Sequence, residues 1–233
     1  MIDLAIEERV ARLVLQRPSA SNAFTTEMLS QLLVALTRAA GEADVLALSA
    51  AGADFSLGRD RQDAKAAGAP PFEAFKLITD VNAALARFPG IVVCAVQGRA
   101  YGFALGMVMR SDIAIATADA RFMLDEVKLG IAPMFILAEI GNHLAPKAAL
   151  DIVLSSREFG AAEAKELGLV SRVVAASELK PSVDGLIAEL GLRDPEVLKA
   201  SKRYFAAVSQ LPREARGAYA LVEQTRFAER RKH

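Results

Sequence analysis

This 233-residue chain contains little cysteine and little histidine, and neither charge is in excess. Cys94 is the only cysteine; we expect it to be buried and inert, and its isolation excludes a disulfide framework or a thiolate metal site. Lys plus Arg and Asp plus Glu both number 28 without long runs, a balance that does not favour nucleic-acid binding. His143 and His233 lack metal-ligand spacing, so we expect structural or exposed histidines and no metal.

Long apolar segments are also missing. The N-terminus lacks a basic-then-apolar signal, and no run of about eighteen apolar residues occurs. We therefore expect a soluble, cytoplasmic protein without a membrane partner. No G-x-G-x-x-G follows the first strand-like run and no G-x-x-x-x-G-K-[ST] occurs, which disfavours dinucleotide and P-loop sites.

Apolar residues are abundant but come in short runs. They make up 53% of the chain, enough for a full core. Much of this share is alanine, which is typical of tightly packed helices and of subunits that bury surface against each other, so we expect an oligomer. Strand-like runs alternate with helical patterns, which predicts an α/β fold with largely parallel strands.

The expected elements follow from apolar periodicity and from Gly and Pro punctuation. Strands are predicted at residues 2–6, 10–16, 45–49, 91–96, 113–116 and 169–174. Helices are predicted from Thr25 or Thr26 to residue 40 and at 72–88, 177–191, 194–209 and 213–231. A further short helix is predicted to end at about residue 110. Small residues and prolines at 66–71 predict a mobile loop between two of these elements.

Two glycine turns each follow a short apolar strand. They are Phe55-Ser-Leu-Gly-Arg-Asp60 and Gln97-Gly-Arg-Ala-Tyr-Gly-Phe-Ala-Leu-Gly106. If the strands at 45–49 and 91–96 are sheet neighbours, the turns emerge side by side and present backbone N–H groups together. Two convergent N–H donors in a dry cleft stabilise a developing oxyanion.

The ordered set of motifs resembles the crotonase superfamily, the enoyl-CoA hydratase/isomerase family. The first turn is similar to the family's F-[SCA]-x-G-x-D and the second to its A-x-N-G-x-A-x-G-G-G. Further matching segments are Arg17-Pro18, Asn22-Ala23-Phe24, Ser111-Asp112-Ile113-Ala114, Ala120-Arg-Phe-Met-Leu-Asp-Glu-Val-Lys-Leu-Gly130 and Ala162-Glu-Ala-Lys-Glu-Leu-Gly-Leu-Val-Ser171. The match covers most of the chain and runs without gaps from about residue 95 to 171.

The resemblance implies a spiral of ββα units followed by helices. Residues 1–175 would form the spiral core with an acyl-CoA site, and residues 176–233 a helical segment for oligomerisation or as a pocket lid. Family members assemble as trimers or dimers of trimers, so a homotrimer or hexamer is implied. The substrate would be a coenzyme A thioester, with no further cofactor.

The resemblance also implies the site residues. The thioester oxygen would lie between the backbone N–H groups of Arg59 and Phe103. Substrate contacts are expected at five further positions: Ala23, Asp60, Arg61, Gly102 and Gly106. Phe103 stands where the family has glycine, and its N–H survives the change while its ring would shorten the acyl pocket.

One of the two glutamates of family hydratases is replaced. Glu126 matches the second, and Gly106 stands at the position of the first. Water addition benefits from two carboxylates, whereas moving a double bond from the 3 to the 2 position needs one base that removes and returns a proton. Glu126 therefore favours isomerase chemistry over hydration, with Asp125 and Glu139 as the nearest substitutes for the missing carboxylate.

Several alternatives stay open on the sequence alone. Glu126 could be an ordinary solvated carboxylate. The Arg59 side chain could bind an acyl carboxylate or a CoA phosphate, or it could be exposed and point away. Decarboxylation with Arg59 holding a carboxylate, and a catalytically silent acyl-CoA binding or assembly protein, are the two rival functions.

Overall fold

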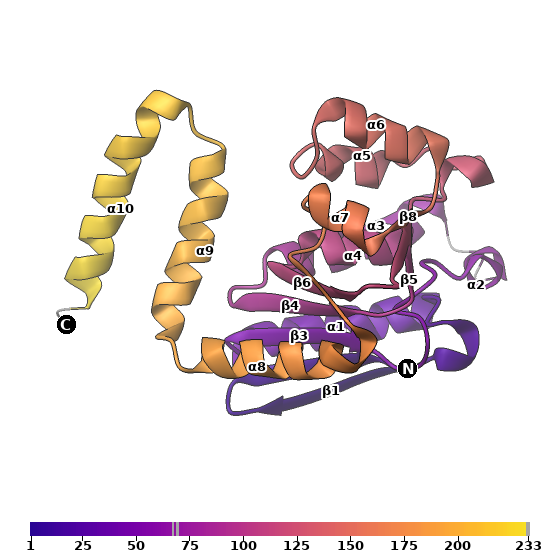
Figure 1. Cartoon of the computed structure of the whole chain (residues 1–233), viewed down its shortest axis with the longest axis horizontal. Coiled ribbons are helices and arrows are strands. Elements are labelled where there is room, and N and C mark those ends of the chain that lie inside the picture. Colours follow the sequence, from indigo (N-terminus) through magenta and orange to yellow (C-terminus); the bar gives the residue numbers. More distant parts are fainter. Residues whose placement is uncertain (67, 69, 232–233) are drawn as a thin grey trace.

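A six-stranded sheet forms the centre of the molecule. The computed structural model describes residues 1–66, 68 and 70–231. Within them the main sheet has the order β1-β2-β3-β4-β6-β9, and a smaller sheet has the order β5-β7-β8 (Figure 1). The strands are β1 (Ile2–Glu7), β2 (Val10–Leu15), β3 (Val45–Ala50), β4 (Ile91–Val96), β5 (Arg99–Tyr101), β6 (Ile113–Thr117), β7 (Arg121–Met123), β8 (Phe159–Gly160) and β9 (Arg172–Val174).

Helices connect and cover these strands. The α-helices are α1 (Thr26–Glu42), α2 (Arg61–Ala66), α3 (Pro71–Ala86), α4 (Phe103–Arg110), α5 (Met134–Ile140), α6 (Pro146–Ser155), α7 (Ala161–Glu166), α8 (Leu179–Gly191), α9 (Pro195–Ser209) and α10 (Arg216–Arg230). Short 3-10 helices occur at η1 (Pro18–Ala20), η2 (Val127–Leu129), η3 (Ala176–Glu178) and η4 (Arg213–Ala215).

The opening of the chain folds as its pattern predicts. β1 and β2 pair as an antiparallel hairpin. Thr25 then caps α1, since its side chain accepts a hydrogen bond of 3.0 Å from the Met28 N–H. Leu29 and Leu32 on the apolar face of α1 are fully buried, whereas Leu33 is partly buried. From β2 onward, the neighbours in the main sheet are parallel, which confirms the α/β prediction.

The main sheet is buried on both faces, which explains the unbroken apolar run of β4. Its alternate residues belong to two hydrophobic clusters. Cys94 and its neighbours on one face pack with α1, α3 and α4, whereas Val93 on the other face packs with Leu186 and Ile187 of α8. Continuous rather than alternating hydrophobicity is typical of parallel strands covered by helices on both sides. Burial also raises the pKa of the Cys94 thiol, as expected for an inert cysteine.

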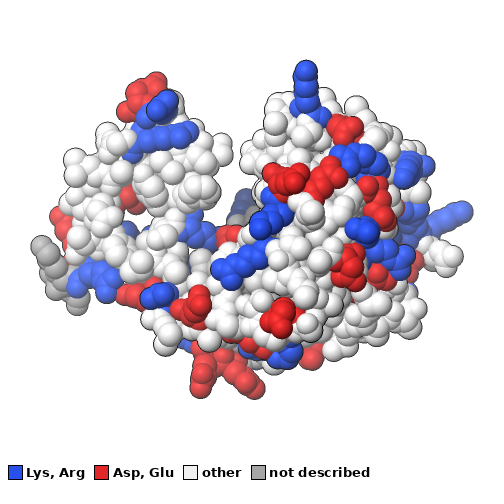
Figure 2. All heavy atoms as spheres, viewed as in Figure 1, with Lys and Arg blue, Asp and Glu red and all other residues white. Residues whose placement is uncertain are grey.

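The helical C-terminal segment has two parts. α8 packs against the sheet, whereas α9 and α10 form a hairpin that stands away from the body (Figure 1). Neither α9 nor α10 contains a buried residue within the described chain. Lys202 of α9 anchors the hairpin through Asp112 at 2.7 Å. Basic and acidic residues lie side by side over the face drawn in Figure 2, in line with the balanced charge of the sequence.

The small sheet was not predicted, because strands of two or three residues carry no readable alternation. The predicted loop at 66–71 includes residues outside the described ones, and His233 lies outside them as well. Among the described residues, no helix has both the length and the hydropathy to cross a membrane.

Candidate active site

The two glycine turns lie side by side. β3 and β4 are parallel neighbours, so both turns leave the same edge of the sheet. Backbone hydrogen bonds join them: the Phe55 N–H donates to the Gln97 carbonyl at 2.8 Å, and the Tyr101 N–H donates to the Ser56 carbonyl at 3.0 Å. The prediction that the turns are adjacent is therefore confirmed.

Gly58 allows the closest approach between the turns. Its φ is +80°, and a Cβ built on it would lie 2.8 Å from the Tyr101 carbonyl oxygen and 3.4 Å from the Phe103 nitrogen. Both the positive φ and the close contact require glycine. The first turn therefore passes directly beside the beginning of α4.

Two backbone N–H groups at this junction find no acceptor within the described residues. Arg59 forms an isolated parallel bridge with Phe24: Gly58 and Asp60, the flanking residues, carry its two hydrogen bonds. The Arg59 N–H therefore faces away from the bridge. Phe103 is the first residue of α4, where helical N–H groups lack intrahelical acceptors. Neither N–H donates a hydrogen bond to another residue that the structure describes.

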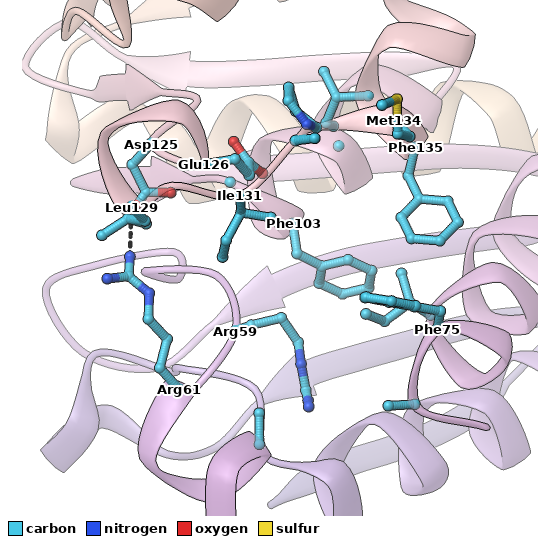
Figure 3. Close-up of a pocket in the computed structure, with 18 of the residues that line it drawn as sticks. Arg59, Arg61, Phe75, Phe103, Asp125, Glu126, Leu129, Ile131, Met134 and Phe135 are labelled. Carbon is cyan, nitrogen blue, oxygen red and sulfur yellow. Dashed lines mark hydrogen bonds and ion pairs between the residues drawn. The ribbon is translucent and has the colours of Figure 1, made fainter. Parts of the chain in front are cut away.

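An apolar cleft of about 660 Å³ opens beside these groups. Its walls come from α3, α4 and α5, with Phe75 and Phe135 in contact across it at a ring separation of 5.7 Å. The Phe103 ring packs edge-on against Phe24 at 5.1 Å. Arg59 of the first turn and Arg61 of α2 line the cleft, whereas Asp125 and Glu126 come from the segment after β7. Figure 3 shows the Arg61 side chain directed towards Asp125 and the Arg59 side chain directed away from Glu126.

Glu126 places a carboxylate in this cleft. The residue is half-buried, and its Oε2 is fully buried without a hydrogen-bond partner among the described residues. Its Oε1 lies 3.3 Å from the position that a Cβ would take on Gly102, whose φ is +49°. Burial raises the pKa of Glu126, and the nearby Asp125 charge adds to the increase. Glu126 is therefore not the freely solvated carboxylate of the alternative interpretation.

The raised Glu126 pKa predicts a specific pH dependence of stability. A folded-state pKa above the ordinary glutamate value of 4.5 means that the folded protein holds this proton more tightly than the unfolded chain. Glu126 therefore destabilises the folded state increasingly as pH rises from 4.5 through the raised value. We expect the melting temperature of Glu126→Gln minus that of the wild type to increase over this range. A difference that stays constant with pH would contradict the burial of this carboxylate.

The other candidate carboxylates are held in ion pairs. Asp125 lines the cleft and pairs with Arg61 at 2.5 Å. Glu139 of α5 pairs with Arg110 of α4 and does not line the cleft. Glu126 is therefore the carboxylate of this group that lines the cleft outside an ion pair.

Arg110 occupies the space next to Gly106. Its Nη1 lies 2.8 Å from the position of a Cβ on Gly106 and donates to the Gly106 carbonyl at 2.7 Å. Its side chain is 96% buried. Sequence reasoning missed Arg110, although its i+4 spacing from Gly106 places both on one face of α4.

The Arg59 side chain is half-buried and lines the cleft. Its Nη1 donates to the Phe24 carbonyl at 2.9 Å, and burial lowers the pKa of its guanidinium. The alternative of an exposed arginine is therefore wrong, although the guanidinium is held by the Phe24 carbonyl. Binding of an acyl carboxylate or a CoA phosphate by Arg59 stays a prediction.

The structure brings three of the five expected substrate-contact residues to the cleft. Arg61, Gly102 and Gly106 line it, whereas Ala23 and Asp60 do not. The Ala23 carbonyl accepts a hydrogen bond of 2.7 Å from Arg17, and Asp60 pairs with the same arginine at 2.8 Å. Asp60 also accepts from the first N–H groups of α2. Direct contact of Ala23 and Asp60 with a substrate stays a prediction.

An ion pair between Asp54 and Arg99 joins the two glycine turns. Arg99 donates to both carboxylate oxygens of Asp54, at 2.8 and 2.7 Å, and these bonds lower the pKa of the largely buried Asp54 to about 2. A lowered folded-state pKa stabilises the fold above the unfolded value of 3.8, and this stabilisation is lost as pH falls towards 2.

We expect Asp54→Asn to lower the free energy of unfolding by about 1–2 kcal/mol at neutral pH, since Arg99 is half exposed and its pairing is partly screened. The deficit should shrink as pH falls from 4 towards 2. Urea denaturation of both proteins across this pH range measures it. An equal loss of unfolding free energy at both ends of the pH range would contradict the lowered pKa of Asp54 in the folded protein.

Solved structures share this architecture over nearly the whole chain. An enoyl-CoA hydratase of Mycobacterium smegmatis superposes with a TM-score of 0.88 at 28% identity, covering 96% of this chain and 89% of that one. Pseudomonas aeruginosa AtuE superposes with a TM-score of 0.88 at 29% identity, covering 98% and 90%. The fold is a crotonase fold with a helical C-terminal segment.

The sequence then identifies the family. The family model for enoyl-CoA hydratase/isomerase matches residues 5–232, and the chain belongs to that family. A relative in Mycobacterium tuberculosis (strain CDC 1551 / Oshkosh), named "Probable enoyl-CoA hydratase echA8", is 33% identical over 177 residues, covering 74% of this chain and 68% of the relative.

Proposed function

We propose that this protein is an acyl-CoA enzyme that stabilises a thioester enolate. The thioester oxygen would accept hydrogen bonds from the Arg59 and Phe103 N–H groups, and Glu126 would transfer the proton. The observation that carries the proposal is that one apolar cleft is lined by two residues whose N–H groups, and by a buried carboxylate whose Oε2, make no hydrogen bond with the described part of the chain. Family membership supports a coenzyme A thioester as the substrate.

The cleft favours both halves of this chemistry. Donors fixed in the backbone stabilise the enolate oxygen without reorganising when the charge forms. Apolar walls strengthen these hydrogen bonds because they lower the local dielectric. The raised pKa of Glu126 makes its carboxylate a stronger base than an exposed glutamate.

Isomerisation is the reaction that a single free carboxylate supports best. The Glu126 carboxylate would take a proton from the α carbon of a 3-enoyl thioester. The C–H electron pair would move into a dienolate, whose negative charge lies on the thioester oxygen. The protonated Glu126 would then return the proton to the γ carbon, giving the 2-enoyl thioester, so that no water, oxidant or reductant is consumed.

Hydration has less support because its second carboxylate is not in place. The Arg110 guanidinium fills the space next to Gly106, and Asp125 and Glu139 are held by arginines. No cofactor beyond the CoA of the substrate enters the proposed mechanism. Assembly as a homotrimer or a hexamer stays a prediction.

Product analysis tests the proposal. Purified protein is incubated separately with a 2-enoyl-CoA and a 3-enoyl-CoA, and the products are separated by chromatography. We expect interconversion of the two enoyl thioesters, with little 3-hydroxyacyl-CoA. Hydration without isomerisation would overturn the reaction assigned here. Binding of both thioesters with no turnover would instead identify a silent acyl-CoA binding protein.

A further inference from the structure

Unpartnered polar atoms concentrate in the cleft. Within the described residues, four buried side-chain atoms make no hydrogen bond, and three of them belong to residues that line the cleft: Asn82 Oδ1, Arg110 Nε and Glu126 Oε2. A buried polar group without a partner costs free energy, so such groups are rare unless they have a function. Glu126 is explained by the proposed proton transfer, whereas Arg110 and Asn82 are not.

Arg110 has donors left for a ligand. A guanidinium carries five N–H donors and no acceptor. Its partners among the described residues are the Gly106 carbonyl on Nη1 and Glu139 on Nη2, and the Nε–H has none there. Glu139 is about one third exposed and lies outside the cleft wall. The guanidinium therefore lines the cleft, whereas its acidic partner does not.

The position of Arg110 sets where such a ligand group would lie. Its guanidinium adjoins Gly106, one turn of α4 beyond Gly102, and Gly102 adjoins the Glu126 carboxylate. One helical turn is about 5.4 Å. An anionic group at Arg110 would therefore lie only a few carbon atoms along the acyl chain from the carbon next to the thioester. Asn82, on the neighbouring helix α3, adds a second polar group to the same apolar wall.

We propose that Arg110 is a specificity-determining residue that binds a carboxylate on a short acyl group, so that the preferred ligands are CoA thioesters of dicarboxylic acids. A planar guanidinium suits a carboxylate in geometry and in charge. The inference rests on the proposed function, since it assumes that the cleft holds the acyl chain of a thioester.

Binding of two matched thioesters tests this inference. Isothermal titration calorimetry compares glutaryl-CoA with valeryl-CoA, acyl groups of equal chain length that differ in the terminal carboxylate, on the full-length protein. We expect the wild type to bind glutaryl-CoA at least about tenfold more tightly, as hydrogen bonds to a charged group predict. Arg110→Met should abolish this preference while binding of valeryl-CoA is retained.

The variant Glu139→Gln separates ligand binding from a structural role. If Arg110 binds the ligand carboxylate, Glu139→Gln keeps the preference for glutaryl-CoA, because the guanidinium remains. If Arg110 serves only to anchor Glu139, the wild type shows no preference, and the inference is overturned. Should Arg110→Met fail to fold, Arg110→Lys takes its place, and we expect the preference to fall without disappearing. Failure of both thioesters to bind the wild type would overturn the proposed function as well, whereas equal binding of both, or tighter binding of valeryl-CoA, would overturn this inference alone.

Discussion

Replacing Glu126 by glutamine is expected to lower kcat for enoyl-CoA isomerisation by about 10²–10⁴-fold, the usual contribution of a general acid–base group. Glutamine preserves the size of the side chain and removes the proton-accepting carboxylate. The Glu126 Oε2 makes no hydrogen bond with the described residues, so the substitution breaks no internal bond at this atom. KM should change much less than kcat. Steady-state kinetics with a 3-enoyl-CoA measures both constants.

Glu166→Gln is the matched control for this substitution. Glu166 is an exposed residue of α7, and it forms no ion pair within the described part of the chain. The same chemical change at this position should leave kcat within about twofold, the scale of a neutral surface substitution. A kcat for Glu126→Gln equal to that of the wild type would remove Glu126 from the mechanism while leaving the fold and the cleft intact.

Gly58→Ala is expected to damage both activity and stability. Its added methyl group would meet the Tyr101 carbonyl oxygen at 2.8 Å, and the backbone would hold an alanine at a φ of +80°. Relief of this contact moves the first turn away from α4 and so separates the Arg59 and Phe103 N–H groups. We expect a loss in kcat of about 10²–10³-fold, as for removal of one oxyanion donor, and a loss of about 1–3 kcal/mol in the free energy of unfolding.

Gly185→Ala provides the comparison for Gly58→Ala. Gly185 lies inside α8, where an added methyl group meets nothing within 4 Å. Alanine is the better helix former, so we expect unchanged kcat and a stability gain of up to about 1 kcal/mol. Circular dichroism melts and the same kinetic assay apply to both variants. Wild-type kcat in Gly58→Ala would contradict the role of the adjacent turns.

Much of the fold could be predicted because its core strands are continuous apolar runs. β3 and β4 can be predicted from their apolar residues alone, and the glycines that follow them mark the turns that form the site. β7 and β8 could not be predicted, since segments of three and two residues have no measurable period. Their place is set by tertiary pairing, since β7 pairs with β5 and β8 pairs with β7.

The site was predictable in its backbone and less so in its long side chains. Glycine positions and the Glu126 match pointed to Arg59, Phe103 and Glu126, which the structure places around one cleft. The sequence cannot say that Arg110 folds back over Gly106, because that conformation depends on Glu139, which lies on α5 and not on the same helix. The burial of Arg59 could not be predicted either, because its guanidinium donates to the Phe24 carbonyl, a group distant in the sequence.

The proposed chemistry requires that the cleft stabilises an enolate and that Glu126 moves the proton. The most direct measurement is hydrogen–deuterium exchange at the α carbon of butyryl-CoA in D₂O, followed by mass spectrometry. This ligand has no double bond to shift or hydrate, so exchange reports proton removal alone. We predict that the wild type incorporates α-deuterium and that Glu126→Gln does so at least about 100-fold more slowly. If the wild type binds butyryl-CoA without α-carbon exchange, or if both proteins exchange at the same rate, proton removal by Glu126 in this cleft is contradicted.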